Sequence, residues 1–84
     1  MNDINLLKKK IIYRSEHRGI KEMDILLSNF VKKYINKFDI IELKQLKDLL
    51  NIDDNNLFKW YLNKKSKIQI PKNKISNLLK RFKI

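Results

Sequence analysis

Side chains that could perform chemistry are few in this chain of 84 residues. The chain has one histidine, His17, and no cysteine, which excludes a histidine metal cluster, a disulfide framework and a thiolate nucleophile. The four serines suggest no nucleophile–base arrangement with that histidine. A single glycine cannot form a glycine-rich phosphate loop. We therefore expect a binding protein and not an enzyme, with no catalytic residue and no metal site.

The paired carboxylates Asp53 and Asp54 are the remaining candidates for metal binding. An acidic pair that follows a break in a helical pattern is far more often a helix cap than a metal site. Asp54 is accordingly predicted to be the N-cap of a short helix. His17 falls near the last turn of another helical pattern, where a cation complements the exposed carbonyl groups.

The stretch from Arg18 to Asp24 stands out by its composition. It contains the only glycine, Gly19, and one of three arginines, followed by the acids Glu22 and Asp24, in a chain of formal net charge +11. A lone glycine between two helical patterns predicts a sharp turn, or a place where another surface comes very close. Arg18 and Glu22 would then lie together on the outside of the protein. The two acids would also favour the dipole of the following helix by about 0.3–1 kcal/mol.

Five amphipathic segments must position these residues. Their apolar residues recur at spacings of three and four, as in helices, and no segment alternates with period two. The clearest stripe runs from Met23 to Ile35, Asp39 with Glu42 has the form of a capping box, and Pro71 suits a first helical turn. The sequence predicts an all-α fold, a single compact bundle of five short helices in one domain over residues 1–84. The helices are expected at about residues 3–17, 20–36, 40–50, 55–62 and 71–82.

Basic residues are concentrated near the C-terminus, where residues 59–84 carry nine of them and no acid. Such a surface would attract a polyanion, whether nucleic acid or anionic lipid. Yet 17 of the 20 basic residues are lysine, and the chain is also rich in isoleucine and asparagine. This mixture is typical of a genome-wide codon bias, which raises the lysine content without selecting a nucleic-acid site. The preference for lysine over arginine and the lack of a recognition motif disfavour nucleic acid as a partner.

Three aromatic residues, Phe58, Trp60 and Tyr61, crowd onto one short helical segment. Phe58 and Trp60 are two residues apart and therefore point in different directions, so at least one ring is expected to be partly exposed. The simplest interpretation is that Trp60 covers the core. The alternative is that these rings form a second binding surface besides the turn at Gly19.

No window approaches 18 consecutive apolar residues, so no segment is expected to span a membrane. The first ten residues lack the apolar run and the cleavage site of a secretory signal. Asp3 and the shortage of arginine and serine argue against a transit peptide. We therefore expect a cytoplasmic protein.

Two stretches of this sequence resemble the motifs of a known family, over about residues 8–62. The first, Arg18 to Asp24, resembles the Arg-Gly-x-x-Glu-(apolar)-Asp signature of the small succinate dehydrogenase assembly factors. The second, Asp53 to Trp60, is similar to the Asp-Pro-Asp/Glu-Leu-aromatic-x-Trp element of that family. Asn55 replaces the usual proline and Asn56 the usual acid, and the basic segment 64–83 departs from the family's pattern.

The resemblance implies a five-helix bundle that binds the flavoprotein subunit of succinate dehydrogenase and promotes covalent attachment of FAD to it. Such a chaperone would hold the subunit in the conformation in which the subunit's own histidine joins the flavin. The FAD then belongs to the client, and no cofactor is expected to be bound stably. Fumarate reductase is a second candidate client, and we expect a monomer. The partner-binding residues implied by position are Arg18, Gly19, Glu22, Asp24, Phe58 and Trp60.

Other functions stay open beside this one. A small basic nucleic-acid-binding module would use the lysines of residues 64–83 against phosphates. An antitoxin-like regulator would bind a protein that is not a flavoprotein. A membrane-surface helix at residues 71–84 is a further alternative.

Overall fold

The structure is a computed structural model that describes residues 3–83, and all regular secondary structure in that range is helical. Its helices are α1 (Asp3–Glu16), α2 (Lys21–Tyr34), α3 (Ile40–Leu50), α4 (Asp54–Tyr61) and α5 (Lys74–Arg81). The predicted all-α bundle of five short helices is confirmed. The predicted domain, residues 1–84, and the alternative membrane-surface helix, residues 71–84, both extend beyond the described range.

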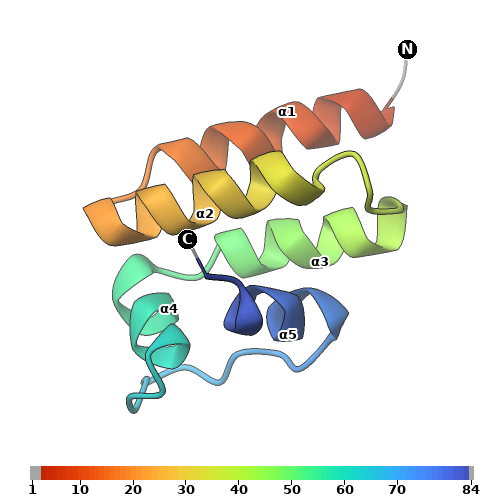
Figure 1. Cartoon of the computed structure of the whole chain (residues 1–84). Helices are drawn as coiled ribbons and strands as arrows, with labels where there is room; N and C mark the ends of the chain where they lie inside the picture. The colour runs from red at the N-terminus through yellow and green to blue at the C-terminus, as the bar shows by residue number, and fades with distance from the viewer. Residues whose placement is uncertain (1–2, 84) are drawn as a thin grey trace.

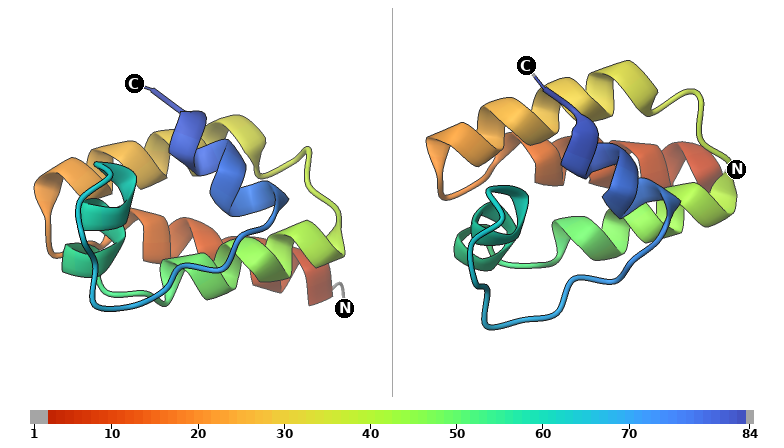
Figure 2. Two further views of the ribbon diagram at one scale, coloured as in Figure 1. Left: turned by 90° about the horizontal axis from the view of Figure 1, so that it is seen from below. Right: turned by 60° about the horizontal axis from the view of Figure 1, so that its bottom comes forward.

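The three longer helices form one layer, which the two short helices close from one side. α1 and α2 make an antiparallel hairpin, and α3 packs along α1 (Figure 1). α5 packs on α3 and lies across the layer, whereas α4 lies at the end where α2 begins and α3 ends (Figure 2). This arrangement places the α1–α2 turn and the α3–α4 turn at the same end of the bundle (Figure 1).

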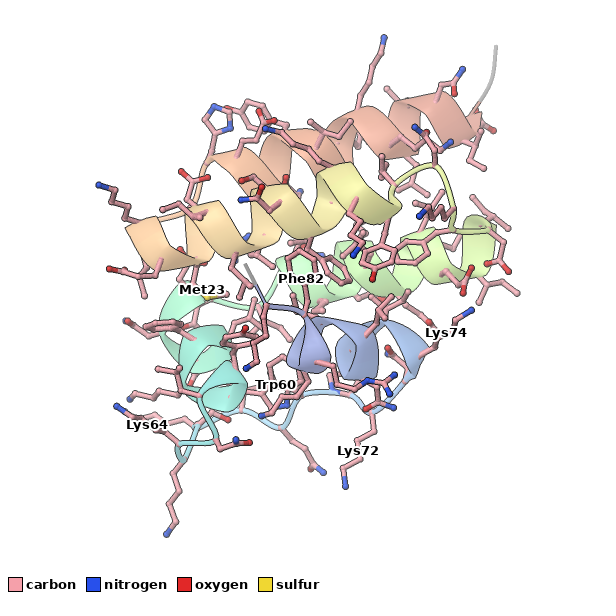
Figure 3. All side chains as sticks on the ribbon, in the orientation of Figure 1. Met23, Trp60, Lys64, Lys72, Lys74 and Phe82 are labelled. Atoms are coloured by element: carbon pink, nitrogen blue, oxygen red, sulfur yellow. The ribbon has the colours of Figure 1, made fainter. Side chains whose placement is uncertain are left out.

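Phe30 on α2 is fully buried and lies at the centre of a group of aromatic rings. Its centroid is 5.0 Å from that of Tyr34, 6.3 Å from that of Phe38 and 5.4 Å from that of Phe82. Phe82 follows α5, so this contact fixes the end of α5 against α2 (Figure 3). The buried residues of α2 are those of the predicted stripe, namely Met23, Leu26, Leu27, Phe30 and Val31.

The predicted capping box at the start of α3 is confirmed. The Glu42 N–H donates to Asp39 Oδ1 at 2.8 Å, and the Asp39 N–H donates to Glu42 Oε1 at 2.9 Å. Glu42 Oε2 also lies 2.6 Å from the Lys74 ammonium at the start of α5. The hydrogen bond from Lys74, followed by that from the Asp39 backbone, lowers the pKa of Glu42.

The prediction that Pro71 occupies the first turn of the last helix is wrong. α5 begins at Lys74 because Asn73 caps it: the Ser76 N–H donates to Asn73 Oδ1 at 2.9 Å. The buried Ser76 Oγ accepts from the Asn73 N–H at 3.0 Å and donates to the Pro71 carbonyl at 2.7 Å. These bonds tie residues 71–73 to the helix start as a cap and leave them outside the helix.

The segment between α4 and α5, residues 62–73, has no regular structure but is attached to the bundle at several points. Asn63 has a φ of 62°, the left-handed conformation that asparagine tolerates and that ends α4. The Lys67 N–H donates to Asn56 Oδ1 on α4 at 2.8 Å. Ile70 is buried in the core. We call residues 62–73 the α4–α5 segment.

Candidate partner-binding site

The two motifs of the sequence meet in space. Residues 17–20 connect α1 to α2, and residues 51–53 connect α3 to α4 beside them (Figure 1). Arg18 and Asp54, which are 36 residues apart in sequence, are the side chains that join the two turns. We call these two connections, with the first turns of α2 and α4, the junction.

Arg18 satisfies carbonyl groups at the end of α3. Its Nη1 donates to the Leu50 carbonyl at 2.7 Å and its Nη2 to the Ile52 carbonyl at 2.9 Å. Nη1 also lies 3.4 Å from the Arg14 carbonyl in the last turn of α1. The last carbonyls of a helix have no partner within the helix and carry partial negative charge, so a cation placed there stabilises the helix end. Arg18 therefore fastens the end of α3 to the end of α1.

The remaining donors of Arg18 face Asp54, the first residue of α4. Both Nε and Nη2 lie 2.6 Å from Asp54 Oδ1, and the two side chains are only 9% and 11% exposed. The other oxygen of this carboxylate, Oδ2, accepts from the Gly19 N–H at 2.5 Å and from the Ile20 N–H at 3.0 Å. Ile20, the N-cap residue of α2, has no side chain that can accept a hydrogen bond. The Asp54 carboxylate instead accepts the N–H groups that lie just ahead of that helix.

Two expectations from the sequence are corrected here. Arg18 was expected on the outside, but every nitrogen of its guanidinium has an acceptor within its own chain, which holds the side chain inside. Asp54 was expected to be the N-cap of α4, but the cap is Asp53, whose Oδ2 accepts from the Asn56 N–H at 3.2 Å. Hydrogen bonds from the Asn56 side chain and then its backbone lower the pKa of Asp53. Asp54 is thereby free to hold the junction.

Gly19 is exposed at the junction, and neither its conformation nor the packing around it requires a glycine. Its φ is not positive. A Cβ at this position would lie 3.5 Å from Asp54 Oδ2, which is an ordinary van der Waals distance. The turn would therefore accept alanine.

Glu22 and Asp24 lie in the first turn of α2, as predicted, where their charge suits the helix dipole. Glu22 is exposed and Asp24 is half-buried. The ion pairs among residues 3–83 involve neither of these carboxylates. The structure thus places Glu22 one turn from Gly19 on an accessible surface, with its carboxylate available to a partner.

Phe58 and Trp60 are both half-buried on α4, and both pack against the core. The Lys80 ammonium lies 4.6 Å from the centroid of the Trp60 ring and donates to the Trp60 carbonyl. Burial, and then the nearby Lys83, lower the pKa of Lys80. Trp60 is therefore engaged with α5, towards which it points in Figure 3, and not with Arg18 or Gly19. Trp60 thus packs against the core and is partly exposed, and its role in a second binding surface stays a prediction.

Sequence reasoning missed the structural role of Asp54. The available signal was that the second motif contains two acids, of which a helix needs only one as its cap, while the first motif offers a lone arginine.

His17 lies at the end of α1 as predicted, and its Nδ1 donates to the Tyr13 carbonyl at 2.8 Å. Within residues 3–83, no three acidic or histidine side chains gather to form a metal site, and no helix is both long and apolar enough to cross a membrane.

Comparison with known proteins bears on these motifs. A family model described as "Flavinator of succinate dehydrogenase" matches residues 9–83. A protein of Schizosaccharomyces japonicus named succinate dehydrogenase assembly factor 2, mitochondrial, is 40% identical over 55 residues, which are 66% of this chain and 38% of that protein. A protein of the same name from Dictyostelium discoideum is 36% identical over 64 residues, 76% of this chain and 45% of that protein. A third, from Arabidopsis thaliana, is 37% identical over 51 residues, 61% of this chain and 27% of that protein.

The matched region thus spans less than half the length of these relatives. No solved structure matches this chain. The family model, in contrast, covers nearly the whole chain and includes both motifs of the junction. The chain belongs to the family of flavinators of succinate dehydrogenase.

Proposed function

We propose that this chain is an assembly factor that docks on the flavoprotein subunit of succinate dehydrogenase and promotes covalent attachment of FAD to that subunit. Membership of the flavinator family supports the class of function. The chain's role is non-catalytic: the flavin and the histidine that it joins belong to the client, and this chain holds no cofactor stably. It supplies binding energy for one client conformation.

The observation that carries the docking surface is the exposed Gly19. Its backbone conformation and its surroundings leave room for a side chain, so the fold alone does not explain the glycine. A partner whose backbone passes close to this turn would explain it, because a Cβ would stand in the way. Glu22, exposed one turn further along α2, supplies a carboxylate beside that approach.

The junction residues then divide into two groups. Arg18 and Asp54 position the turns, since their polar atoms bind the chain itself. Gly19 and Glu22 face outwards and make the contact, with Asp24 beside them. Contacts of Arg18, Phe58 and Trp60 with the client remain predictions that binding measurements on variants of each residue would test.

A binding protein of this kind acts by shifting a conformational equilibrium of its client. A factor that binds the reactive conformation more tightly by about 1.4 kcal/mol raises the ratio of that conformation to the alternative one about tenfold. Such a preference requires a rigid docking surface, and the buried Arg18–Asp54 pair provides it by joining four chain segments at one point.

The test compares cells with and without this chain by in-gel flavin fluorescence of the flavoprotein subunit. Loss of the chain is expected to remove most of the covalent flavin, and Glu22→Gln to lower it. Asp3→Asn is the matched control because Asp3 is also a first-turn acid, at the opposite end of the bundle, so the helix-dipole loss is similar. Undiminished fluorescence in cells that lack the chain would contradict the proposal.

The client range, the oligomeric state and the cellular location are tested by separate measurements. Fumarate reductase is a second candidate client, which the same fluorescence assay scores. A monomer is expected on size-exclusion chromatography with light scattering. The relatives are named mitochondrial proteins, whereas the location proposed for this chain is the cytoplasm, which cell fractionation tests.

A further inference from the structure

A groove lined by basic and apolar residues lies where α4 meets the α4–α5 segment. It is an open groove of about 440 Å³, whose lining includes the apolar Trp60, Ile68 and Ile70 and the basic Lys67 and Lys72. Ile68 is 44% exposed, so its side chain is accessible to a partner. We call these five residues the basic groove.

The cations around this groove have no acidic partner in the described part of the chain. Residues 59–83 carry nine basic residues and no acid. Of these, Lys74 pairs with Glu42, and Lys80 is engaged with Trp60. Lys64, Lys65, Lys67 and Lys72 are exposed, and no ion pair among residues 3–83 involves them. Lys64 and Lys72 extend away from the bundle (Figure 3). Lys67 and Lys72 thus line the groove, and Lys64 and Lys65 add positive charge to the same segment.

The lysines are carried on backbone that is held in place. The α4–α5 segment is fixed by the left-handed turn at Asn63, by the hydrogen bond from Lys67 to Asn56 and by the buried Ile70. Ser66 Oγ also donates to the Ile68 carbonyl at 2.6 Å. A ligand that binds here does not have to order the loop first, so less binding free energy is lost to conformational entropy.

Nucleic acid fits this surface poorly. Binding of single strands relies on aromatic faces that are open to stacking bases. The protein's own lysines already lie over the Trp60 ring in the groove and over the ring of the adjacent Tyr61: Lys80 lies 4.6 Å from the Trp60 centroid and Lys83 lies 5.1 Å from the Tyr61 centroid. A membrane fits poorly too, because a surface helix needs a free apolar face, and Ile75 and Leu79 of α5 are fully buried in the core.

The helix α4 begins at the junction and ends beside the groove. Asp54 at the junction and Trp60 at the groove are six residues apart on this helix, which is about 9 Å at 1.5 Å per residue. A partner that covers about 800 Å² of the surface would reach both.

We propose that the basic groove binds an acidic segment of the flavoprotein subunit, with carboxylates beside Lys64, Lys65, Lys67 and Lys72 and an apolar side chain against Ile68. This inference rests on the proposed function and adds a second contact to the junction. Lysines suit such a segment because they act as point charges and need no planar, bidentate partner. Their attraction also accelerates the encounter between the two proteins, and this effect weakens as salt is added.

The first test measures binding of the FAD-free flavoprotein subunit encoded by the same genome, over a series of salt concentrations. The variant replaces Lys64, Lys65, Lys67 and Lys72 by glutamine; the matched control replaces the exposed Lys9, Lys10, Lys32 and Lys44. Exposed ion pairs contribute little each, so we expect about tenfold weaker binding and a shallower salt dependence for the groove variant alone. Equal loss in both variants, or unchanged binding, overturns the inference.

The second test asks which lysines touch carboxylates. A zero-length carbodiimide joins an amine to a carboxylate only where the two are in contact. We expect amide links from Lys67 or Lys72 to aspartate or glutamate of the subunit, and links confined to other lysines overturn the inference.

A third test assays wild type and the groove variant for binding to single-stranded DNA and to phosphatidylserine vesicles at about 0.1 M salt, near physiological ionic strength. Retention of either by wild type, abolished in the groove variant, would also overturn it.

The two proposals fail in distinguishable ways. If wild type does not bind the subunit at all, the proposed function fails and this inference fails with it. If wild type binds and the groove variant binds equally well, the groove inference alone fails.

Discussion

Arg18 and Asp54 form an ion pair with both side chains largely buried, and Nη2 lies 2.6 Å from Oδ1. The same arginine binds the carbonyls of Leu50 and Ile52, and the same carboxylate binds the N–H groups of Gly19 and Ile20. The pair therefore connects the ends of α1 and α3 with the starts of α2 and α4. It joins the stretches Arg18 to Asp24 and Asp53 to Trp60 into one structural unit.

The first prediction concerns Arg18→Ala. Removing Arg18 from this largely buried pair leaves Asp54 Oδ1 and the Leu50 and Ile52 carbonyls without their donor, so the free energy of unfolding is expected to fall by about 3 kcal/mol. Urea unfolding followed by circular dichroism measures this loss. Arg81→Ala is the control, because Arg81 is exposed near the end of α5 and its removal costs less than about 1 kcal/mol. Equal stability of the two variants would show that the pair does not hold the junction.

The second prediction concerns Gly19→Ala, which separates folding from docking. A Cβ at Gly19 meets only ordinary contact with Asp54 Oδ2, so stability is expected within about 0.5 kcal/mol of wild type. Binding to the flavoprotein subunit is expected to fall, because the added methyl group projects at the docking surface. Calorimetry of the chain alone and a binding titration measure the two effects. A variant that unfolds readily, or one that binds like wild type, would contradict this role of Gly19.

The fold was predictable from local patterns because each helix carries its own signals. The stripe on α2 and the Asp39–Glu42 capping box involve residues within a few positions of one another, and both are confirmed. Neighbouring candidates were harder to separate. Asp53 and Asp54 are equally good caps in sequence, and Pro71 and Asn73 compete for the start of α5, so the predicted cap of α4 and the predicted start of α5 were wrong.

The burial of Arg18 could not be predicted in this way. Its acceptors belong to Leu50, Ile52 and Asp54, more than 30 residues away, and they come near only when α3 packs along α1. A charged residue beside a glycine at a turn is exposed in most local patterns, and tertiary packing reversed that expectation here. Gly19 and Glu22 are exposed as expected, because the turn itself places them outside.

The third prediction is a pH dependence of stability from Glu42 and Lys74. Their contact lowers the pKa of Glu42 below 4.5 and raises the pKa of Lys74 above 10.5. A lowered carboxyl pKa gives stability that is present above pH 4.5 and is lost as the pH falls through the folded-state pKa. A raised lysine pKa gives stability that is present below pH 10.5 and is lost as the pH rises through its folded-state pKa.

Glu42→Gln is therefore expected to flatten both limbs of the profile of urea midpoint against pH. Glutamine can still accept the Asp39 N–H, so the capping box survives. Part of the acid limb should remain, because the pKa of Asp53 is also lowered. Asp48→Asn, an exposed acid on the same helix without an ion pair among the described residues, serves as control. A Glu42→Gln profile that runs parallel to that of wild type would exclude this linkage.

The fourth prediction tests the start of α5. Asn73→Ala removes the acceptor of the Ser76 N–H and is expected to cost about 1 kcal/mol of unfolding free energy. Asn77→Ala, on the exposed face of the same helix, is expected to be neutral or slightly stabilising because alanine favours helices. Thermal or urea unfolding of the two variants gives the comparison. The assignment of Asn73 as the cap fails if the two substitutions have the same effect.

The most direct test of the account is reconstitution from purified components. The FAD-free flavoprotein subunit is incubated with FAD, with or without this chain, and covalent flavin is measured by its fluorescence after denaturing electrophoresis. The account predicts that wild type accelerates covalent attachment and that Gly19→Ala, although folded, does so much less. Attachment at the same rate with and without the chain would contradict the central claim that docking at the junction promotes flavinylation.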